Sequence, residues 1–176
     1  MQFTKDTFYI TLRNRLAALN PARVITLNGV IRPAVVVAVN EAVIPVKPLP
    51  NAFYLEWGAA QAVPQQVGDR GTFSLECLIS YHTFGTVESG VDRGRTLNAL
   101  DTELITICQP ASTTKLDYTQ TTPANLGTSV VWTTPQLGKV AGSEAPRTEA
   151  LPRGTTGVRL ERTSSLKVFF FSEVKF

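Results

Sequence analysis

The stretch GTFSLECLISYHTF (residues 71–84), with the segment that follows it up to residue 108, decides the fold. Between residues 73 and 81 the odd positions are apolar and the even positions are mostly polar. Successive side chains of a strand point to opposite faces, so this pattern predicts a long strand with one buried face. A loop follows, in which Ser89 and Asp92 have the spacing of a helix capping box.

An amphipathic helix is predicted after this loop. Its apolar residues recur at helical spacing, and they are Leu97, Leu100, Leu104 and Ile107. We expect this stripe to pack over the long strand. The charged residues between these positions are expected to face away from the strand, and they are Arg93, Arg95, Asp101 and Glu103.

The composition predicts one globular domain that spans residues 1–176. The chain is 43% hydrophobic and 18% charged, and its length is ordinary for a single core. A net charge of +3, spread along the chain, does not predict nucleic acid as the main ligand. No apolar run approaches the ~20 residues that a membrane-spanning helix needs, so we expect no membrane partner. Basic residues in the first fifth fit either a solvated helix face or a phosphate-binding patch.

The segments before and after the long strand predict further elements. Residues 4–19 carry an apolar stripe and predict the first helix, the stripe being Tyr9, Leu12, Leu16 and Leu19. Asn28-Gly29 between apolar runs predicts a tight hairpin. Residues 53–57 (FYLEW) predict a short aromatic strand, and residues 59–71 predict a loop.

The last part of the chain predicts a final strand pair, residues 158–162 and 166–174. The second of these segments is apolar on both faces, because Leu166, Val168 and Phe170 alternate with Phe169 and Phe171. Such a strand belongs in the middle of a sheet or under a neighbouring subunit.

Residues 109–156 are rich in Thr, Pro, Gly and Ser, and they contain two short β-like segments, residues 114–118 and 129–133. Residues 135–156 have no periodicity, which is typical of a functional or a disordered loop. Trp132, Arg147 and Arg153 fit a loop that orders against a partner, and a mobile loop is the alternative. The fold class is therefore α+β, with a mainly antiparallel sheet, two helices on one face and a long polar loop or hairpin insertion.

Few residues fit catalytic chemistry. His82 is the only histidine, it lies on the polar parity of the long strand, and no Gly-x-Ser-x-Gly motif presents a serine. Cys77 and Cys108 fit two buried thiols better than a disulfide or a zinc site. Glu56, which lies among aromatic residues, is expected to form a cross-strand ion pair. We therefore predict no enzymatic activity, no metal and no cofactor.

The order of the predicted parts resembles a known family. A first helix with LRNRL (residues 12–16) precedes a hairpin, the long strand, a helix that starts with DRGRTL (residues 92–97), and final strands. This order resembles the tail terminator, or tail-completion, proteins of tailed bacteriophages. The resemblance covers residues 4–108 and 157–175, and residues 109–156 lie outside its minimal pattern.

The resemblance implies a subunit that forms a six-membered ring, stops polymerisation of the tail tube and meets the head-proximal neck or connector protein. The implied partners are further copies of the chain, the tube protein, the neck protein and, in contractile tails, the sheath. DNA passes through the ring as cargo, and the protein is made in the host cytoplasm and ends in the virion. A ring needs heterologous contacts, and interfaces favour aromatic and arginine side chains. The candidate contact residues are Phe53, Trp57, Arg93, Arg95, Trp132, Arg147, Arg153, Phe169 and Phe171.

Other functions stay open. Another head–tail joining subunit or a tail-tube subunit is one alternative, and a tube subunit would polymerise into long cylinders. A monomeric ligand-binding or hydrolytic domain, with residues 135–156 as a lid, predicts a concave pocket with perturbed carboxyl groups. A nucleic-acid-binding module that uses the basic first helix predicts steeply salt-dependent binding.

Overall fold

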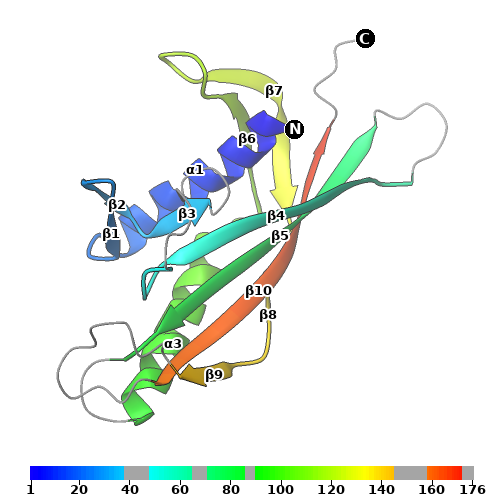
Figure 1. Cartoon of the computed structure of the whole chain (residues 1–176). Helices are drawn as coiled ribbons and strands as arrows, with labels where there is room; N and C mark the ends of the chain where they lie inside the picture. Colours follow the sequence, from blue (N-terminus) through cyan, green and yellow to red (C-terminus); the bar gives the residue numbers. More distant parts are fainter. Residues whose placement is uncertain (38–47, 65–70, 86–89, 145–157, 172–176) are drawn as a thin grey trace.

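The computed structural model describes residues 1–37, 48–64, 71–85, 90–144 and 158–171, and its fold is α+β (Figure 1). The main sheet has the strand order β3-β4-β5-β10-β7-β6, and β8 and β9 also pair with β10. A separate two-stranded sheet contains β1 and β2. The elements are α1 (Gln2–Leu19), β1 (Val24–Leu27), β2 (Val30–Pro33), β3 (Val35–Val37), β4 (Phe53–Ala62), β5 (Thr72–Thr83), α3 (Gly90–Ile107), β6 (Ser112–Asp117), β7 (Ala124–Trp132), β8 (Gln136–Leu137), β9 (Ala141–Glu144) and β10 (Val158–Phe171).

The antiparallel pair β5 and β10 forms the centre of the sheet. Their register runs from Thr83 opposite Leu160 to Thr72 opposite Phe171. The alternation predicted for β5 is confirmed, because its odd positions from Leu75 to Tyr81 are buried while Glu76 and Ser80 are exposed. β10 lies between β5 and β7, which confirms the prediction that the C-terminal segment is internal to a sheet.

The prediction of two final strands is wrong, because β10 is one continuous strand of 14 residues. The polar residues at its middle suggested a break. Ser164 is nevertheless buried, and its hydroxyl lies 3.2 Å from the hydroxyl of Tyr81 on β5. A buried serine with a hydrogen-bond partner is compatible with a continuous strand, because its polar group remains satisfied.

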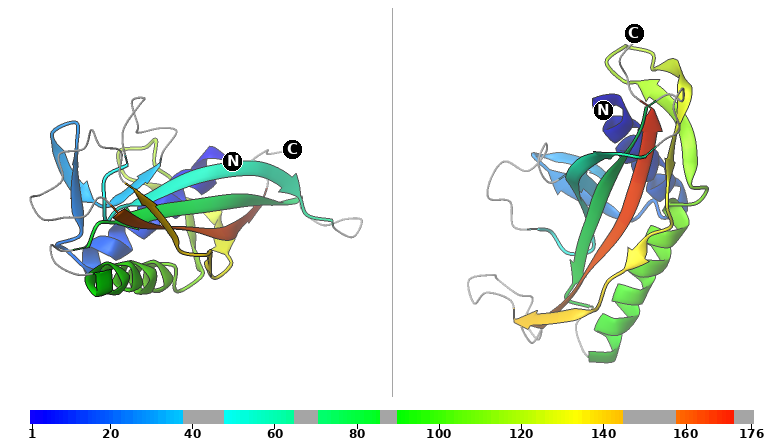
Figure 2. Two further views of the ribbon diagram at one scale, coloured as in Figure 1. Left: turned by 60° about the horizontal axis from the view of Figure 1, so that its bottom comes forward. Right: turned by 90° about the vertical axis from the view of Figure 1, so that its right-hand side faces the viewer.

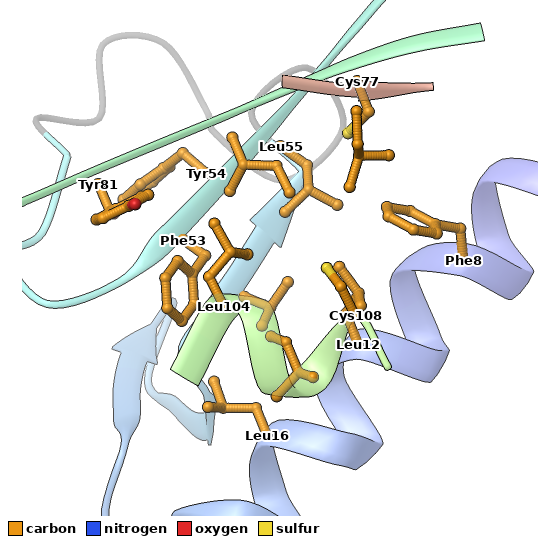
Figure 3. Close-up of a cluster of buried hydrophobic side chains, with 14 of the residues drawn as sticks. Phe8, Leu12, Leu16, Phe53, Tyr54, Leu55, Cys77, Tyr81, Leu104 and Cys108 are labelled. Atoms are coloured by element: carbon orange, nitrogen blue, oxygen red, sulfur yellow. The ribbon is translucent and has the colours of Figure 1, made fainter. Parts of the chain in front are cut away.

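The two helices pack on the same face of the sheet, as the sequence predicts. Phe8, Leu12 and Leu16 of α1 and Leu104 of α3 have no exposed surface, and they meet side chains of β4 and β5 in one core (Figures 2 and 3). The predicted stripe of α1 needs one correction. Leu19 is 46% exposed, although the helical period places it on the same side as Phe8 and Leu12, and it is the last residue of α1.

Arg15 joins α1 to the end of α3 and the start of β6. Its Nη1 donates to the carbonyl oxygens of Ile107 (3.0 Å) and Pro110 (2.7 Å), and its Nη2 donates to that of Ser112 (3.3 Å). The last carbonyls of a helix lack partners within the helix, and a cation stabilises them. The guanidinium also lies 5.3 Å from the centroid of the Trp132 ring. This basic residue of the first helix therefore has a role within the fold.

The predicted hairpin is confirmed. β1 and β2 pair antiparallel on either side of Asn28 and Gly29, whose φ angles are +50° and +79°. Two positive φ values in succession are the geometry that matches the twist of a two-residue hairpin. The hairpin lies beside α1, apart from the main sheet (Figure 1).

Two predicted loops are partly wrong. Residues 59–62 continue β4, because the strand absorbs a register shift between Trp57 and Ala60 and keeps its pairing with β5. Within residues 109–144, β6 and β7 form an antiparallel pair, which agrees with the predicted hairpin, and they extend the main sheet beyond β10, which the sequence did not predict. The β-like segments at 114–118 and 129–133 are confirmed as parts of these strands. Ser89 and residues 145–156 lie outside the described residues.

The segment between β8 and β9 is fixed to β10 through Gly138. Its N–H donates to the Thr163 carbonyl (3.1 Å), and its own carbonyl accepts from Nη1 of Arg162 (2.9 Å). A Cβ at this position would overlap the carbonyl oxygen of Thr163. Gly138→Ala is therefore expected to lower the free energy of unfolding by about 1–3 kcal/mol, measured by urea unfolding.

A matched control is Gly142→Ala, where a Cβ would meet only Leu160 Cδ2 at 3.9 Å, an ordinary contact. This control is expected to change stability by no more than about 0.5 kcal/mol. Equal effects of the two substitutions would show that the close approach at Gly138 does not contribute to the free energy of unfolding.

Candidate interaction surfaces

Two exposed apolar residues and a partly exposed one, Phe169, form a patch on the face of the sheet that the helices leave open. We call Val131, Phe169 and Phe171 the sheet-end patch. Val131 lies directly opposite Phe169, and Phe171 follows Phe169 on the same side of β10. Val131 is 45% exposed and Phe171 is 40% exposed. Strand alternation explains the arrangement, because the intervening residues Trp132 and Phe170 point into the core instead.

The strand beneath this patch is well anchored. The ring of Phe170 stacks on Phe73 of β5 with centroids 5.8 Å apart. The Nζ of buried Lys115 lies 5.8 Å from the Phe170 centroid, and it donates to the Phe171 carbonyl at 3.5 Å. These contacts hold the backbone that presents Phe169 and Phe171, so the patch is a preformed surface.

A second exposed apolar surface lies on the β1–β2 hairpin. We call Val24, Thr26 and Ile31 the hairpin surface. Thr26 is paired with Ile31, and all three side chains point away from the core. Val24 is 47% exposed and Ile31 is 70% exposed. On the opposite face Ile25 is buried and Leu27 packs against the core. The hairpin therefore buries part of one face, on which Val30 opposite Leu27 is still 60% exposed, and it presents Val24 and Ile31 on the other.

Two of the sequence-predicted contact residues are corrected. Phe53 has no exposed surface, and its ring packs edge-on against Tyr81 with centroids 5.3 Å apart. Trp132 is 2% exposed, and its Nε1 donates to the Cys108 carbonyl at 2.8 Å. Both side chains belong to the core, because the helices cover the face of the sheet on which they lie. Neither one is available for a subunit contact.

The other predicted contact residues are not gathered at one place. Trp57 is partly exposed, and its ring lies between Phe8 (centroids 5.7 Å apart) and the ammonium group of Lys5 (5.6 Å). Exposed Arg95 and partly exposed Arg93 begin α3, near the Thr83 end of β5. Arg147 and Arg153 lie outside the described residues.

Among the predicted residues that the structure describes, the aromatic pair Phe169 and Phe171 lies together on one side of β10, at the Thr72 end of β5. Val131, Val24 and Ile31 were missed by the sequence prediction. The sequence contains no signal for the outward face of the hairpin, because neither parity of residues 24–31 contains a charged residue.

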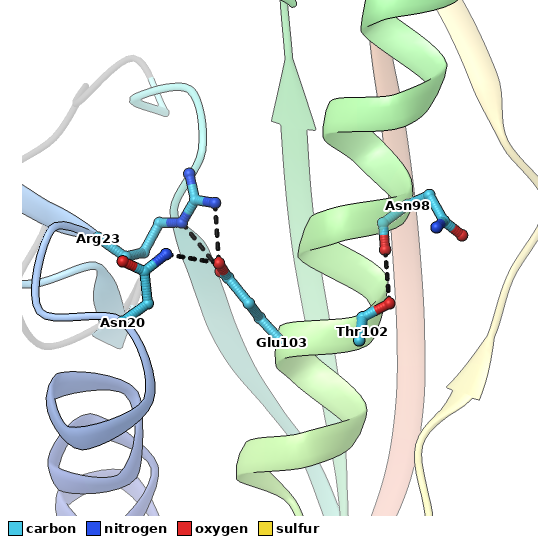
Figure 4. A network of polar contacts seen from close by, with 5 residues as sticks. All are labelled: Asn20, Arg23, Asn98, Thr102 and Glu103. Carbon is cyan, nitrogen blue, oxygen red and sulfur yellow. Dashed lines mark hydrogen bonds and ion pairs between the residues drawn. The ribbon is translucent and has the colours of Figure 1, made fainter.

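Basic residues near the N-terminus make contacts within the fold. The guanidinium of Arg23 pairs with the Glu103 carboxylate at 2.9 and 3.0 Å, and Asn20 donates to the same carboxylate at 2.7 Å (Figure 4). Arg13 lies 5.3 Å from the ring centroid of Tyr9. Arg13, Arg15 and Arg23, three of the basic residues in the first fifth of the chain, therefore have partners within the fold.

A buried polar network joins α3, β5 and β10. The Tyr81 hydroxyl donates to Asp101 Oδ1 at 2.6 Å, and Arg162 Nη2 lies 3.1 Å from Asp101 Oδ2. Asp101 is 6% exposed, so the prediction that it faces away from the core is wrong. Burial, reinforced by its bond to Asp101, holds the pKa of Tyr81 well above its usual range. The hydroxyl therefore remains a donor, and the network acts as a structural joint.

The remaining polar candidates also take structural positions. His82 is 5% exposed, and its ring packs edge-on against Phe84 with centroids 5.5 Å apart. The prediction that His82 lies on the polar face of the long strand is therefore wrong. Glu56 is exposed, and the residue directly opposite it on β5 is Leu78. Leu78 is uncharged, so the predicted ion pair is not formed with this neighbour.

The two cysteines are free and buried, as the sequence predicts. Burial raises the pKa of Cys108 to about 12 and raises the pKa of Cys77 well above its usual range. Both pKa values are higher in the folded protein than in the unfolded chain. The stabilisation that comes from keeping the thiols protonated is therefore complete at neutral pH, and it is lost as the pH rises through the folded-state pKa values.

Since the thiolate is the reactive form, neither cysteine is expected to react with a maleimide in the folded protein at neutral pH. Both are expected to react after unfolding in urea, and mass spectrometry counts the adducts. Labelling of Cys77 or Cys108 at the rate of a free thiol would contradict this burial.

A comparison with models of known protein families gives no match, and a comparison of the sequence with proteins of curated function gives none either. In the part of the chain that the structure describes, neither helix has the length and apolarity that crossing a membrane requires. Within those same residues, His, Cys, Asp and Glu do not gather in a group of three or more at which a metal ion could bind.

Proposed function

We propose that this chain is a non-enzymatic structural subunit of a phage virion, which caps the end of the tail tube as a ring and joins it to the head-proximal neck. The proposal starts from the order of helix, hairpin, long strand, helix and final strand, which resembles the tail terminator family. The observation that carries it furthest is the pair of separate exposed apolar surfaces on one subunit, the sheet-end patch and the hairpin surface.

Two different surfaces on one subunit suit a ring. A closed ring is built from heterologous contacts, in which one surface of each subunit meets a different surface of the next. A two-fold dimer, by contrast, uses the same surface on both partners. The contacts of Arg15 and the Asp101–Arg162 pair join the helices to the sheet, so they fix how the two surfaces are presented.

In this proposal the mechanism is capping by surface complementarity, with no bond made or broken. A preformed surface loses little conformational freedom on binding, which favours the contact with a tube end. DNA is cargo that passes through the ring, and the contacts that Arg15 and Arg23 make within the fold agree with a weak hold on it.

The test of capping is a tube-length assay. The tail-tube subunit of the same virus is polymerised with increasing amounts of this chain, and the tube lengths are measured by electron microscopy. We expect shorter tubes whose ends carry a ring-shaped density. Incorporation of the chain along the tubes would contradict the proposal and would favour a tube subunit, and unchanged tube lengths would also contradict it.

A further inference from the structure

We propose that Asn28 is a site of covalent modification, at which the side-chain amide is lost through a cyclic imide formed with the backbone nitrogen of Gly29. The product is an aspartate or an isoaspartate at the turn of the β1–β2 hairpin (Figure 1). This inference does not depend on the proposed ring function. Three observations support it, and they concern the residue that follows Asn28, the exposure of the turn and the weak support of the hairpin.

The reaction needs water and no other reagent. The backbone nitrogen of Gly29 loses its proton to hydroxide and attacks the side-chain carbonyl carbon, Cγ, of Asn28. A bond between these two atoms forms, the bond from Cγ to Nδ2 breaks, and Nδ2 takes a proton from water and leaves as ammonia. Water then opens the cyclic imide at either carbonyl. Opening at the side-chain carbonyl gives aspartate, whereas opening at the backbone carbonyl gives isoaspartate, in which the chain runs through Cβ.

The first observation is the residue that follows each asparagine. The chain has seven asparagines, and glycine follows Asn28 alone. Glycine lacks a Cβ, so no side chain shields the nitrogen that must attack. Asn20 precedes Pro21, which has no backbone N–H to lose. Asn14 and Asn98 lie inside α1 and α3, where the next N–H is engaged in the hydrogen bonds of the helix.

The second observation is the exposure of the turn. Asn28 and Gly29 are both exposed, and a Cβ at Gly29 would have no heavy atom within 4 Å apart from those of its chain neighbours. The last paired residues of the hairpin are Leu27 and Val30, so the backbone nitrogen of Gly29 lies beyond the end of the ladder. Hydroxide and water therefore have access to the turn at which the new bond forms.

The third observation is the weak support of the hairpin. The turn holds Asn28 and Gly29 at φ angles of +50° and +79°, and the backbone of Asn28 must rotate out of this turn for the imide to close. β1 and β2 form a sheet of their own, and Val30 and Ile31 are 60% and 70% exposed. A two-stranded hairpin by itself is marginally stable, and segments with few buried contacts open locally at a small cost in free energy. Local opening therefore gives access to the reactive geometry.

The two products affect the hairpin differently. Aspartate, like asparagine, adopts the left-handed conformation and is favoured before glycine in this turn, so it adds a carboxylate and keeps the pairing. Isoaspartate lengthens the turn by an additional backbone atom. Because the length of the turn sets the register, the pairing of Leu27 with Val30 is lost, and the packing of Ile25 against the core is weakened. Each product lowers the formal net charge of +3 by a single charge.

The test follows the charge of the full chain. The protein is incubated at mildly alkaline pH, and ion-exchange chromatography at intervals separates the forms that have gained a negative charge. Peptide mapping by mass spectrometry locates the change, and an isoaspartyl methyltransferase labels isoaspartate. We expect an acidic form that accumulates with time and maps to residue 28, while Asn98 and Asn125, which are also exposed, keep their amides.

Hydrogen exchange separates the two products. In the form that carries isoaspartate, the amides of residues 24–33 are expected to exchange faster than in the unmodified protein, because the pairing of β1 with β2 is disturbed. In the form that carries aspartate, their exchange is expected to be unchanged. Equal exchange in the two forms would overturn the effect assigned to the longer backbone.

The control variant is Asn28→Gly, because Gly-Gly also favours this type of turn and has no side-chain amide to lose. This variant is expected to keep the elution of the fresh protein throughout the incubation. A synthetic peptide of residues 24–33 is the positive control for the chemistry. If the peptide converts while residue 28 of the full chain keeps its amide, the folded turn protects Asn28 and the proposal is overturned. An acidic form that accumulates equally in Asn28→Gly, or that maps to another asparagine, would overturn it as well.

Discussion

Asp101→Ala is expected to lower the free energy of unfolding by about 3–5 kcal/mol, because it leaves a buried cation without its partner. Arg162, whose side chain is 16% exposed, has Asp101 as its carboxylate at 3.1 Å, and Tyr81 donates to the same group at 2.6 Å. Without the carboxylate, Arg162 keeps the Gly138 carbonyl as the acceptor of its Nη1, but the mostly buried guanidinium charge loses its counter-ion. The Tyr81 hydroxyl keeps only the hydroxyl of Ser164 as a neighbour at 3.2 Å. Urea unfolding followed by tryptophan fluorescence measures the loss.

A double variant distinguishes the cost of an unpaired buried charge from the loss of the ion pair itself. Asp101→Leu with Arg162→Met removes both charges, and it is expected to recover most of the stability that the single change loses. Thr102→Ala is the control on the neighbouring exposed position of α3, with an expected effect within about 0.5 kcal/mol. If Asp101→Ala behaved like Thr102→Ala, the network would not be the joint described above.

Phe8→Ala is expected to cost about 3–5 kcal/mol, the range for removing a buried aromatic ring from a core. Phe8 has no exposed surface, and its ring lies edge-on to both Trp57 (5.7 Å) and Trp132 (5.1 Å). The loss of this ring would leave a cavity between α1 and the sheet. The free energy of unfolding again reports the effect, and the fluorescence of the two tryptophans should change in the folded state.

Leu19→Ala is the matched control for this prediction. Leu19 is an apolar residue of the same helix, but it is 46% exposed, so its truncation is expected to cost no more than about 0.5 kcal/mol. Similar losses at the two positions would mean that Leu19 is packed as tightly as Phe8, and would contradict the exposure of Leu19 at the end of α1.

Elements defined by neighbours in the chain were predictable from the sequence. The alternation of β5, the apolar spacing of α3 and the Asn28-Gly29 turn are local patterns, and all three appear in the structure. Local patterns suffice in these cases because strand parity, helical period and turn geometry depend on residues a few positions apart.

Features that depend on distant residues were not predictable. From the sequence, Asp101 is predicted to be a solvent-facing charge. In the structure β10 places Arg162 beside it, and β5 places Tyr81 beside it. β6 and β7 carry many Ser and Thr residues, and their place in the sheet depends on the pairing of Val131 and Trp132 with β10. A single sequence contains no direct record of such tertiary contacts, so the region 109–156 reads as a loop.

The candidate surfaces were predictable in part. A strand that is apolar on both faces and has helices on one side must expose its other side, which is why Phe169 and Phe171 could be named. The same reasoning failed for Phe53, since the structure buries both Phe53 and its neighbour Tyr54. The hairpin surface was missed because Val24 and Ile31 resemble ordinary strand residues, and only the packing of Ile25 reveals which face is left outside.

The most direct test of the ring is the mass in solution, measured by light scattering across a concentration series with and without tube ends, followed by negative-stain imaging of the main species. We expect particles of one defined mass, seen as closed six-membered rings with a central channel. Open-ended tubes of variable length would contradict it and assign the chain to the tube. A monomer at every concentration, also when tube ends are present, would contradict it as well and favour a domain that acts alone.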